Sequence, residues 1–317
     1  MDIVITGSVA YDYLMTFPGR FKEQILLEKL EVISLSFLVD SLVRRRGGIA
    51  PNIAYTMALL GGKPRILAPV GKDFEEYRTW LEDKGVDTTW AKLIPDKLTA
   101  SFFATTDQDN AQLASFYPGA MAHATELSIK DLESKPDLVV ISPNDPAAMD
   151  QYITECKELN IPYLYDPSQQ VVRVEGDVLC HGIEEALALF ANEYERELIM
   201  KKTGMTQEHI LNHVKFLVVT LGEKGAAVFV NDEEHRVKAV TPKKIVDPTG
   251  AGDAFRGGFL TGYSRGWDWD TCAQMGALTA TYCLESDGPQ GHSYTPEEYV
   301  TRYRQHYDDN GLLDELL

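Results

Sequence analysis

The chain has 317 residues and carries 48 acidic against 30 basic side chains, which gives a formal net charge of −18. A hydrophobic content of 44% with 15 Pro and 24 Gly is typical of a globular protein and excludes disordered, collagen-like and low-complexity chains. The acidic balance argues against binding of nucleic acid or an anionic membrane surface, because both need a basic face. It leaves room for one phosphate group held at a local site.

The cysteines and the N-terminal sequence predict a cytoplasmic location. The four cysteines are widely spaced and form no C-x-x-C pair, a pattern typical of reduced thiols. Asp2 stands where a signal peptide needs Lys or Arg. No run approaches the roughly 18 apolar residues that a membrane-spanning helix requires, so we expect no membrane partner.

Short apolar runs alternate with amphipathic stretches along most of the chain. The runs that we interpret as buried strands are 3–5, 138–141, 163–165, 187–191 and 216–220. The stretches that we interpret as helices are 52–60, 74–84, 146–159 and 206–214. Strands that alternate with helices in this way predict a mainly parallel central sheet covered by helices on both faces, which is a three-layer α/β/α fold.

Two segments, residues 12–46 and 99–117, have a different pattern. Alternation over 101–106 is followed by a polar turn at 107–110 and a second strand over 112–117. A small antiparallel β unit, inserted into the α/β domain, accounts for both segments and could cover a substrate site as a lid. The α/β domain then comprises residues 1–11, 47–98 and 118–317. The alternative is an ordinary surface hairpin.

Several familiar motifs fail. Gly61-Gly62-Lys63 is followed by Pro64, so there is no Walker loop. Gly250-Ala251-Gly252 lacks the third glycine of a dinucleotide fingerprint, because position 255 is Phe. The G-x-S-x-G match around Ser264 follows a helical pattern, whereas a nucleophile elbow requires a strand there. The basic run Arg44–Arg46 is interpreted as a solvated edge.

The most informative stretch is Asp247-Pro-Thr-Gly-Ala-Gly-Asp-Ala-Phe255. Gly250, Ala251 and Gly252 at a helix start leave backbone N–H groups uncovered, and these amides with the helix dipole form an anion site suited to phosphate. Asp253 would repel a phosphate, so we interpret it as a general base that takes a proton from an attacking hydroxyl. The alternative is a glycine-rich turn in which Asp253 caps the helix.

Three further motifs accompany this stretch across nearly the whole chain. They are Gly47-Gly-Ile-Ala-Pro-Asn-Ile-Ala54, Asn192-Glu-Tyr-Glu195 and Thr220-Leu-Gly-Glu-Lys-Gly225. Each alone is weak, since Asn192 and Glu195 could form a mere capping box. Together and in this order, the four motifs resemble those of the ribokinase (PfkB-type) family of sugar and nucleoside kinases. Segments 7–12, 17–21, 116–121 and 166–170 resemble its bacterial, mycobacterial-type, adenosine kinase branch.

The resemblance implies a ribokinase-like fold and an activity, the ATP-dependent phosphorylation of the 5′-hydroxyl of adenosine to AMP in purine salvage. Asp253 would be the base, and the amides of Gly250, Ala251, Gly252 and Asp253 would hold the charge on the transferred phosphoryl group. The acceptor residues would be Asp12, Gly48 and Asn52 at the ribose hydroxyls, Phe102 and Phe116 stacked on the purine, and Ser8, Gln169 and Gln170 as further polar contacts.

The same resemblance implies a donor side and a partner. The ATP-binding residues would be Asn192, Thr220, Leu221, Gly222, Glu223, Lys224, Gly225 and Gly252. Glu195 would hold Mg²⁺ through water. Monovalent cations activate members of this family, but no residues of this chain locate such a site. A homodimer through the lid is expected, because an exposed sheet presents edges that a second copy can cover.

Two other functions stay open. The chain could be another kinase of this fold, acting on inosine, guanosine, cytidine or a ribose- or fructose-type sugar. A simple sugar needs no stacking pocket, so the paired phenylalanines 102 and 116 favour a nucleoside. A non-catalytic nucleoside sensor is the alternative from another class, and the presence of Gly250, Gly252, Asp253 and Glu195 argues against it.

Overall fold

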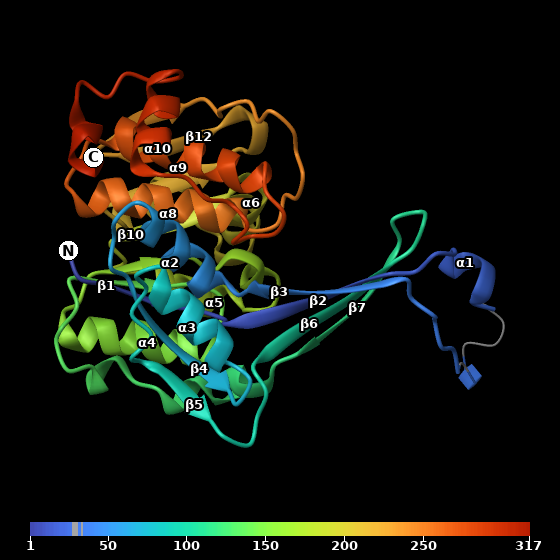
Figure 1. The fold of residues 1–317 in the computed structure, drawn as a ribbon. Coiled ribbons are helices and arrows are strands. Elements are labelled where there is room, and N and C mark those ends of the chain that lie inside the picture. The colour runs from blue at the N-terminus through green and yellow to red at the C-terminus, as the bar shows by residue number, and fades with distance from the viewer. Residues whose placement is uncertain (27–30, 33) are drawn as a thin grey trace.

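A nine-stranded sheet forms the centre of the larger body in the computed structural model, which describes residues 1–26, 31–32 and 34–317 (Figure 1). Residues 27–30 and 33, which belong to the predicted lid, lie outside the described residues. From one edge to the other the strands are β13 (Glu233–Val237), β12 (Ala226–Val230), β11 (Phe216–Thr220), β10 (Ala188–Asn192), β9 (Tyr163–Tyr165), β8 (Leu138–Ile141), β1 (Ile3–Thr6), β4 (Arg65–Gly71) and β5 (Ala91–Ile94). Neighbours are parallel except β12, which is antiparallel to β11 and β13.

Helices cover both faces of this sheet, as the sequence predicts. On one face lie α2 (Ile49–Leu59), α3 (Glu75–Asp83), α8 (Ala251–Ser264), α9 (Trp269–Leu284) and α10 (Pro296–Arg304). On the other lie α4 (Pro146–Leu159), α5 (Gly176–Ile183), α6 (Glu193–Thr203) and α7 (Gln207–His213). Ile3 and Ile5 enter the first core and Val4 the second. Burial on both faces explains why the strands are continuous apolar runs.

The five predicted central strands are all present, and four strands were missed. Strand β13 is polar (Glu-Glu-His-Arg-Val), because its outer edge has no described neighbour in the sheet. Strand β4 contains Pro69, which argues against a strand when read from sequence alone. No helix in the described ranges 1–26, 31–32 and 34–317 is long and apolar enough to cross a membrane.

A second sheet projects from the larger body as a long ribbon, with α1 (Phe21–Gln24) at its far end (Figure 1). Its strands, in order, are β3 (Ser41–Gly47), β2 (Ala10–Thr16), β6 (Ala100–Thr106) and β7 (Gln112–Tyr117). The predicted antiparallel arrangement is wrong in one respect, because β2 and β6 pair in parallel. They come from separate chain segments that each leave the larger body, so no hairpin joins them. The lid sheet also begins at residue 10 rather than 12.

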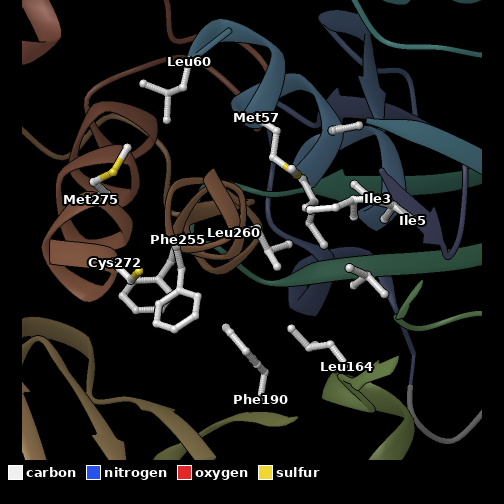
Figure 2. Packing of buried hydrophobic residues seen from close by; sticks show 14 of the residues in the cluster. Ile3, Ile5, Met57, Leu60, Leu164, Phe190, Phe255, Leu260, Cys272 and Met275 are labelled. Atoms are coloured by element: carbon white, nitrogen blue, oxygen red, sulfur yellow. The ribbon is translucent and has the colours of Figure 1, made fainter. Parts of the chain in front are cut away.

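Helix α8 is held tightly between its neighbours, and this fixes the start of the helix. Figure 2 shows Phe255 of α8 beside Cys272 and Met275 of α9, above Phe190 of β10. A methyl group on Gly258 would lie 2.4 Å from the Thr279 hydroxyl and 2.7 Å from a backbone oxygen of α9. The helices therefore approach more closely than any side chain would permit.

Candidate active site

A cavity of about 450 Å³ lies where the carboxyl ends of β1, β10 and β11 face the lid sheet. This is the edge at which open α/β sheets bind ligands. Thirteen of the predicted site residues line it: Ser8, Asp12, Gly48, Asn52, Phe102, Phe116, Gln169, Asn192, Glu195, Thr220, Gly250, Gly252 and Asp253. Segments that are far apart in sequence thus meet at one place.

The anion site predicted from the glycines lies at the N-terminus of α8. Gly250 has φ +79°, a left-handed conformation that favours glycine, and a Cβ there would lie 2.4 Å from that of Pro289. Gly250 and Gly252 line the cavity, whereas Ala251 does not. The amide of Ala251 instead donates to the Pro248 carbonyl at 3.3 Å. The helix dipole favours an anion at this end.

Asp253, in the first turn of α8, is partly buried beside this anion site. Its Oδ2 accepts a hydrogen bond from Asn52 Nδ2 at 2.8 Å. Burial raises the pKa of Asp253 to about 7, against the lowering effects of the Arg256 charge and of the Asn52 hydrogen bond. A carboxyl group with a pKa near neutrality can both accept and release a proton under physiological conditions.

Arg256, which sequence reasoning missed, lies one turn after Asp253 and also lines the cavity. Its Nη2 donates to Asp166 Oδ1 at 2.6 Å and its Nη1 to the Gly252 carbonyl at 3.0 Å. Burial raises the pKa of Asp166, and the Arg256 charge opposes that rise. The available signal was a lone cation three residues after Asp253 in an otherwise apolar helix.

One row of side chains crosses the lid sheet above the cavity. Asp12 on β2 is directly opposite Arg45 on one side and Phe102 on the other, and Phe102 is opposite Phe116. Directly opposite residues share a face of a sheet, so the predicted ribose and purine contacts point the same way. Burial raises the pKa of Asp12 to about 6, although the Arg45 charge lowers it.

Arg45 is not part of a solvated edge, as the basic run had suggested. Its Nη1 donates to Asp247 Oδ2 at 2.6 Å, and its Nη2 to Asp287. It therefore joins β3 of the lid to the loop that precedes α8. Arg44 and Arg46 pair with Glu76 and are more exposed, which fits the prediction better.

The start of α2 contributes two predicted residues, Gly48 and Asn52, and contacts a third, Ser8. Gly48 has φ +96°, and a Cβ there would lie 2.5 Å from the Ser8 carbonyl oxygen. The Ser8 hydroxyl accepts from the Ile49 amide at 3.3 Å. Asn52 is 5% exposed and presents its amide nitrogen to Asp253. The close approach between residues 8 and 48 brings both segments to the cavity.

Six predicted contact residues do not line the cavity. Gln170 is buried elsewhere, and its Nε2 donates to the Asn144 carbonyl at 2.7 Å. Gly222–Lys224 is an exposed 3-10 turn between β11 and β12, flanked by Leu221 and Gly225. Thr220, at the end of β11, is the residue of this motif that reaches the cavity.

Asn192 and Glu195 form the capping box that their spacing also allows, and both still line the cavity. The Asn192 Oδ1 accepts from the Glu195 amide, and Glu195 Oε2 accepts from the Asn192 amide, each at 2.8 Å. Glu195 Oε1 is 3.4 Å from the Ser168 hydroxyl. One carboxylate oxygen at this cavity fits Mg²⁺ that keeps its waters. No cage of three or more acidic, His or Cys ligands exists among the described residues.

Replacing Asp253 by Asn tests the cost of burying this carboxyl group. Its pKa of about 7 exceeds the ordinary value of 3.8, so the fold binds this proton more tightly than the unfolded chain does. The resulting stabilisation is present at low pH and is lost as the pH rises from about 4 through about 7. The neutral amide loses nothing over this range.

The melting temperature of Asp253→Asn relative to wild type should therefore be higher at pH 8 than at pH 5. A difference of a few degrees is expected, since one pKa unit is about 1.4 kcal/mol and 1 kcal/mol is about 2–4 °C in larger domains. Thermal unfolding of both proteins at the two pH values measures it. The same difference at both pH values would contradict the raised pKa.

Comparison with known proteins identifies the family of this chain. The profile of the pfkB family of carbohydrate kinases matches residues 6–296. A nucleoside kinase from Burkholderia thailandensis, solved in complex with inosine, is 35% identical with a TM-score of 0.85, over 96% of this chain and 98% of that one. The nucleoside kinase of Methanocaldococcus jannaschii is 28% identical over 309 residues, 96% of this chain and 97% of the relative. The cytidine kinase of Thermococcus kodakarensis is 27% identical over 295 residues, 91% and 98% of the two chains. The ribokinase-like fold is thereby confirmed, and the chain belongs to the pfkB family of carbohydrate kinases.

Proposed function

We propose that this kinase transfers the γ-phosphoryl group of ATP to the 5′-hydroxyl of a nucleoside, with adenosine as the expected acceptor. The observation that carries the proposal is the content of one cavity. Asp253 and the anion site at α8 lie in it together with Phe102, Phe116 and the carboxyl group of Asp12. A reacting hydroxyl, a phosphate and an aromatic base each find a chemically suitable partner there.

The acceptor end of the cavity suits a nucleoside. Phe102 and Phe116 offer two aromatic side chains from adjacent strands, and stacking of a base on an aromatic ring is worth about 1–3 kcal/mol. Asp12 and Asn52 supply a carboxylate and an amide for the vicinal hydroxyls of ribose. Gln169 lines the same cavity and can reach a polar group of the base.

The donor end lies at the carboxyl ends of β10 and β11. Asn192 and Thr220 line it and would contact the ATP phosphates, and the turn 221–225 would lie beside the adenosine part of ATP. Glu195 would hold Mg²⁺ through water, and the bound ion neutralises charge on the phosphates. The nucleoside kinase of B. thailandensis has also been solved with ADP-inosine, which supports a donor and an acceptor site in one cavity.

In this proposal the chemical step uses groups of α8. Asp253 takes the proton of the 5′-hydroxyl while the 5′-oxygen of the nucleoside forms a bond to the γ-phosphorus. The bond between that phosphorus and the bridging oxygen, which leaves with ADP, breaks. The amides at Gly250 and Gly252 stabilise the charge that develops on the transferred group. Burial in a cavity under the lid limits competing attack by water.

Inosine is the second acceptor to consider, because a relative at 35% identity was solved with it. Cytidine is the named substrate of a more distant relative. The two phenylalanines favour nucleosides over simple sugars, but stacking does not distinguish one purine from another. The preferred acceptor is therefore determined by comparing kcat/KM for different nucleosides and sugars.

Asp253→Asn should lower kcat by about 10²–10⁴-fold, the range that a positioned general base contributes. Wild-type kcat/KM should rise with pH through about 7, because burial sets the pKa of Asp253 there and only the carboxylate accepts a proton. Steady-state kinetics between pH 5 and 9 measure both effects. Turnover near the wild-type level in the Asn variant would remove Asp253 as the base.

A panel of adenosine, inosine, guanosine, cytidine, ribose and fructose should show the highest kcat/KM with adenosine. Phe102→Ala should raise the KM for the nucleoside by about 5- to 150-fold, as expected for the loss of about 1–3 kcal/mol of stacking, and leave the KM for ATP nearly unchanged. Phe103→Ala is the matched control, because Phe103 lies on the opposite face of the lid and stacks on Tyr13 at 4.8 Å. Highest efficiency with a free sugar would overturn the nucleoside assignment.

We also infer a homodimer through the lid. Every residue of β7 is exposed, and neither β3 nor β7 has a further described strand beside it. Leu42 and Leu113 occupy these two edges in one cross-strand row and are 62% and 45% exposed. A second copy would cover them.

The native mass in solution should be twice the 35.4 kDa of one chain. Leu42→Asp combined with Leu113→Asp should lower it to that of a monomer, because a charge on each edge disfavours edge pairing. Leu93→Asp, on the β5 edge of the large sheet and 51% exposed, is the control that should stay dimeric. A wild-type monomer at micromolar concentration would refute the dimer.

A further inference from the structure

Gln290 lies beside the cavity, outside every motif considered in the sequence. It directly follows Pro289, the residue that packs against Gly250, and is 8% exposed. Its Nε2 donates to Asn52 Oδ1 at 2.8 Å and to the Tyr77 hydroxyl oxygen at 2.5 Å. Both donors of this amide nitrogen are therefore used on named buried partners.

The contacts of Tyr77 and Asn52 fix the direction of each hydrogen bond. The Tyr77 hydroxyl donates to the Gly47 carbonyl at 3.0 Å, so its oxygen accepts from Gln290. Asn52 carries one acceptor oxygen and one donor nitrogen. Since Gln290 occupies the oxygen, the nitrogen faces Asp253 at 2.8 Å. The order of donation thus runs from Gln290 to Asn52 and from Asn52 to Asp253.

We propose that Gln290 is a positioning residue that holds the Asn52 amide in the orientation that donates to Asp253, and so keeps Asp253 in its proton-accepting form. This inference rests on the proposed function of Asp253 as the base. A freely turning Asn52 could present its oxygen to Asp253 instead. Two oxygen atoms can share that contact only when the carboxyl group is protonated, and a protonated carboxyl group is not a base.

The other charged and titratable groups around Asp253 come from several elements. They are Arg256 on the same helix, Asp166 after β9, Glu195 on α6 and Cys283 on α9. Arg256 favours the carboxylate, and Asp166 and Glu195 disfavour it. Burial raises the pKa of the Cys283 thiol to about 12, so it is neutral. Asn52 donates a direct side-chain hydrogen bond to Asp253, so the orientation of the Asn52 amide should strongly affect the pKa of Asp253.

Gln290→Glu and Gln290→Met test whether Gln290 sets the orientation of the Asn52 amide. A glutamate at 290 accepts where glutamine donates, so Asn52 must turn its nitrogen toward residue 290 and its oxygen toward Asp253. Loss of this hydrogen bond to the carboxylate should raise the pKa of Asp253 further. In Gln290→Glu, the acid limb of the pH profile should move up by about one to two pH units, so kcat at pH 7 should fall about 5- to 50-fold.

Gln290→Met removes the donor without adding a charge. The acid limb of its kcat pH profile should move in the same direction by a smaller amount. This variant carries the test if Gln290→Glu does not fold, which thermal unfolding shows. The KM for ATP should stay within about threefold of wild type in both variants, since Asn52 and Asp253 lie at the acceptor end. Gln274→Glu is the matched control. Gln274 of α9 accepts a hydrogen bond from the Tyr303 hydroxyl of α10 through its Oε1, and a glutamate carboxylate can still accept that bond.

The outcomes separate the possible roles. A kcat that falls equally at every pH, with the limb unmoved, would show a merely structural role and overturn the proposal. Unchanged kcat and an unchanged limb in both variants would overturn it too. Asp253→Asn is measured alongside: if that variant turns over normally, the base assignment itself fails. If Asp253→Asn is inactive while the acid limbs of both Gln290 variants stay where the wild-type limb lies, only the positioning role of Gln290 is overturned.

Discussion

The hydrogen bond between Asn52 and Asp253 depends on how closely two helices approach, and the rest of the site depends on that approach. The two residues are 201 positions apart in sequence. One turn further along, a Cβ on Gly257 of α8 would lie 2.6 Å from Thr56 Cβ and 2.8 Å from the Ile53 carbonyl oxygen of α2. Only glycine permits this distance. Asn52 precedes Thr56 by one turn of α2, and Asp253 precedes Gly257 by one turn of α8. The close packing of the two helices at Thr56 and Gly257 therefore also brings the Asn52 amide to the Asp253 carboxyl group.

The chain is strongly acidic, yet its cavity is suited to a phosphate. The proposed anion site consists of backbone amides at a helix N-terminus, which carry no formal charge and cost less to bury than an ionised side chain. Arg256 adds one cation, and its bonds to Asp166 and Gly252 hold it beside Asp253. The net charge of −18 therefore describes solubility and excluded partners, whereas a few residues of α8 determine the local field.

Much of the fold follows from local sequence pattern, and much of the site does not. The apolar runs of β1, β8, β9, β10 and β11 are readable because each strand is buried on both faces. The glycines at 250 and 252 are readable because a helix start that binds an anion needs exposed amides. The parallel pairing of β2 with β6 and the roles of Arg45 and Gln290 are tertiary facts. Each concerns a residue whose partner lies far along the chain, and no local spacing encodes it.

Arg45 connects the lid sheet to the loop that leads to α8. Arg45 shares the face of the lid row with Asp12, Phe102 and Phe116, and it also pairs with Asp247 at the start of the loop that leads to α8. Asp247 in turn accepts from the Thr249 amide at 2.8 Å, which shapes that loop just before Gly250. A movement of the lid sheet that shifts β3 would therefore be transmitted through Arg45 to the backbone that precedes Gly250. The proposed binding of a base under the lid and the proposed phosphate site would thereby be coupled through the Arg45–Asp247 ion pair, which is strengthened because its side chains are only 21% and 15% exposed.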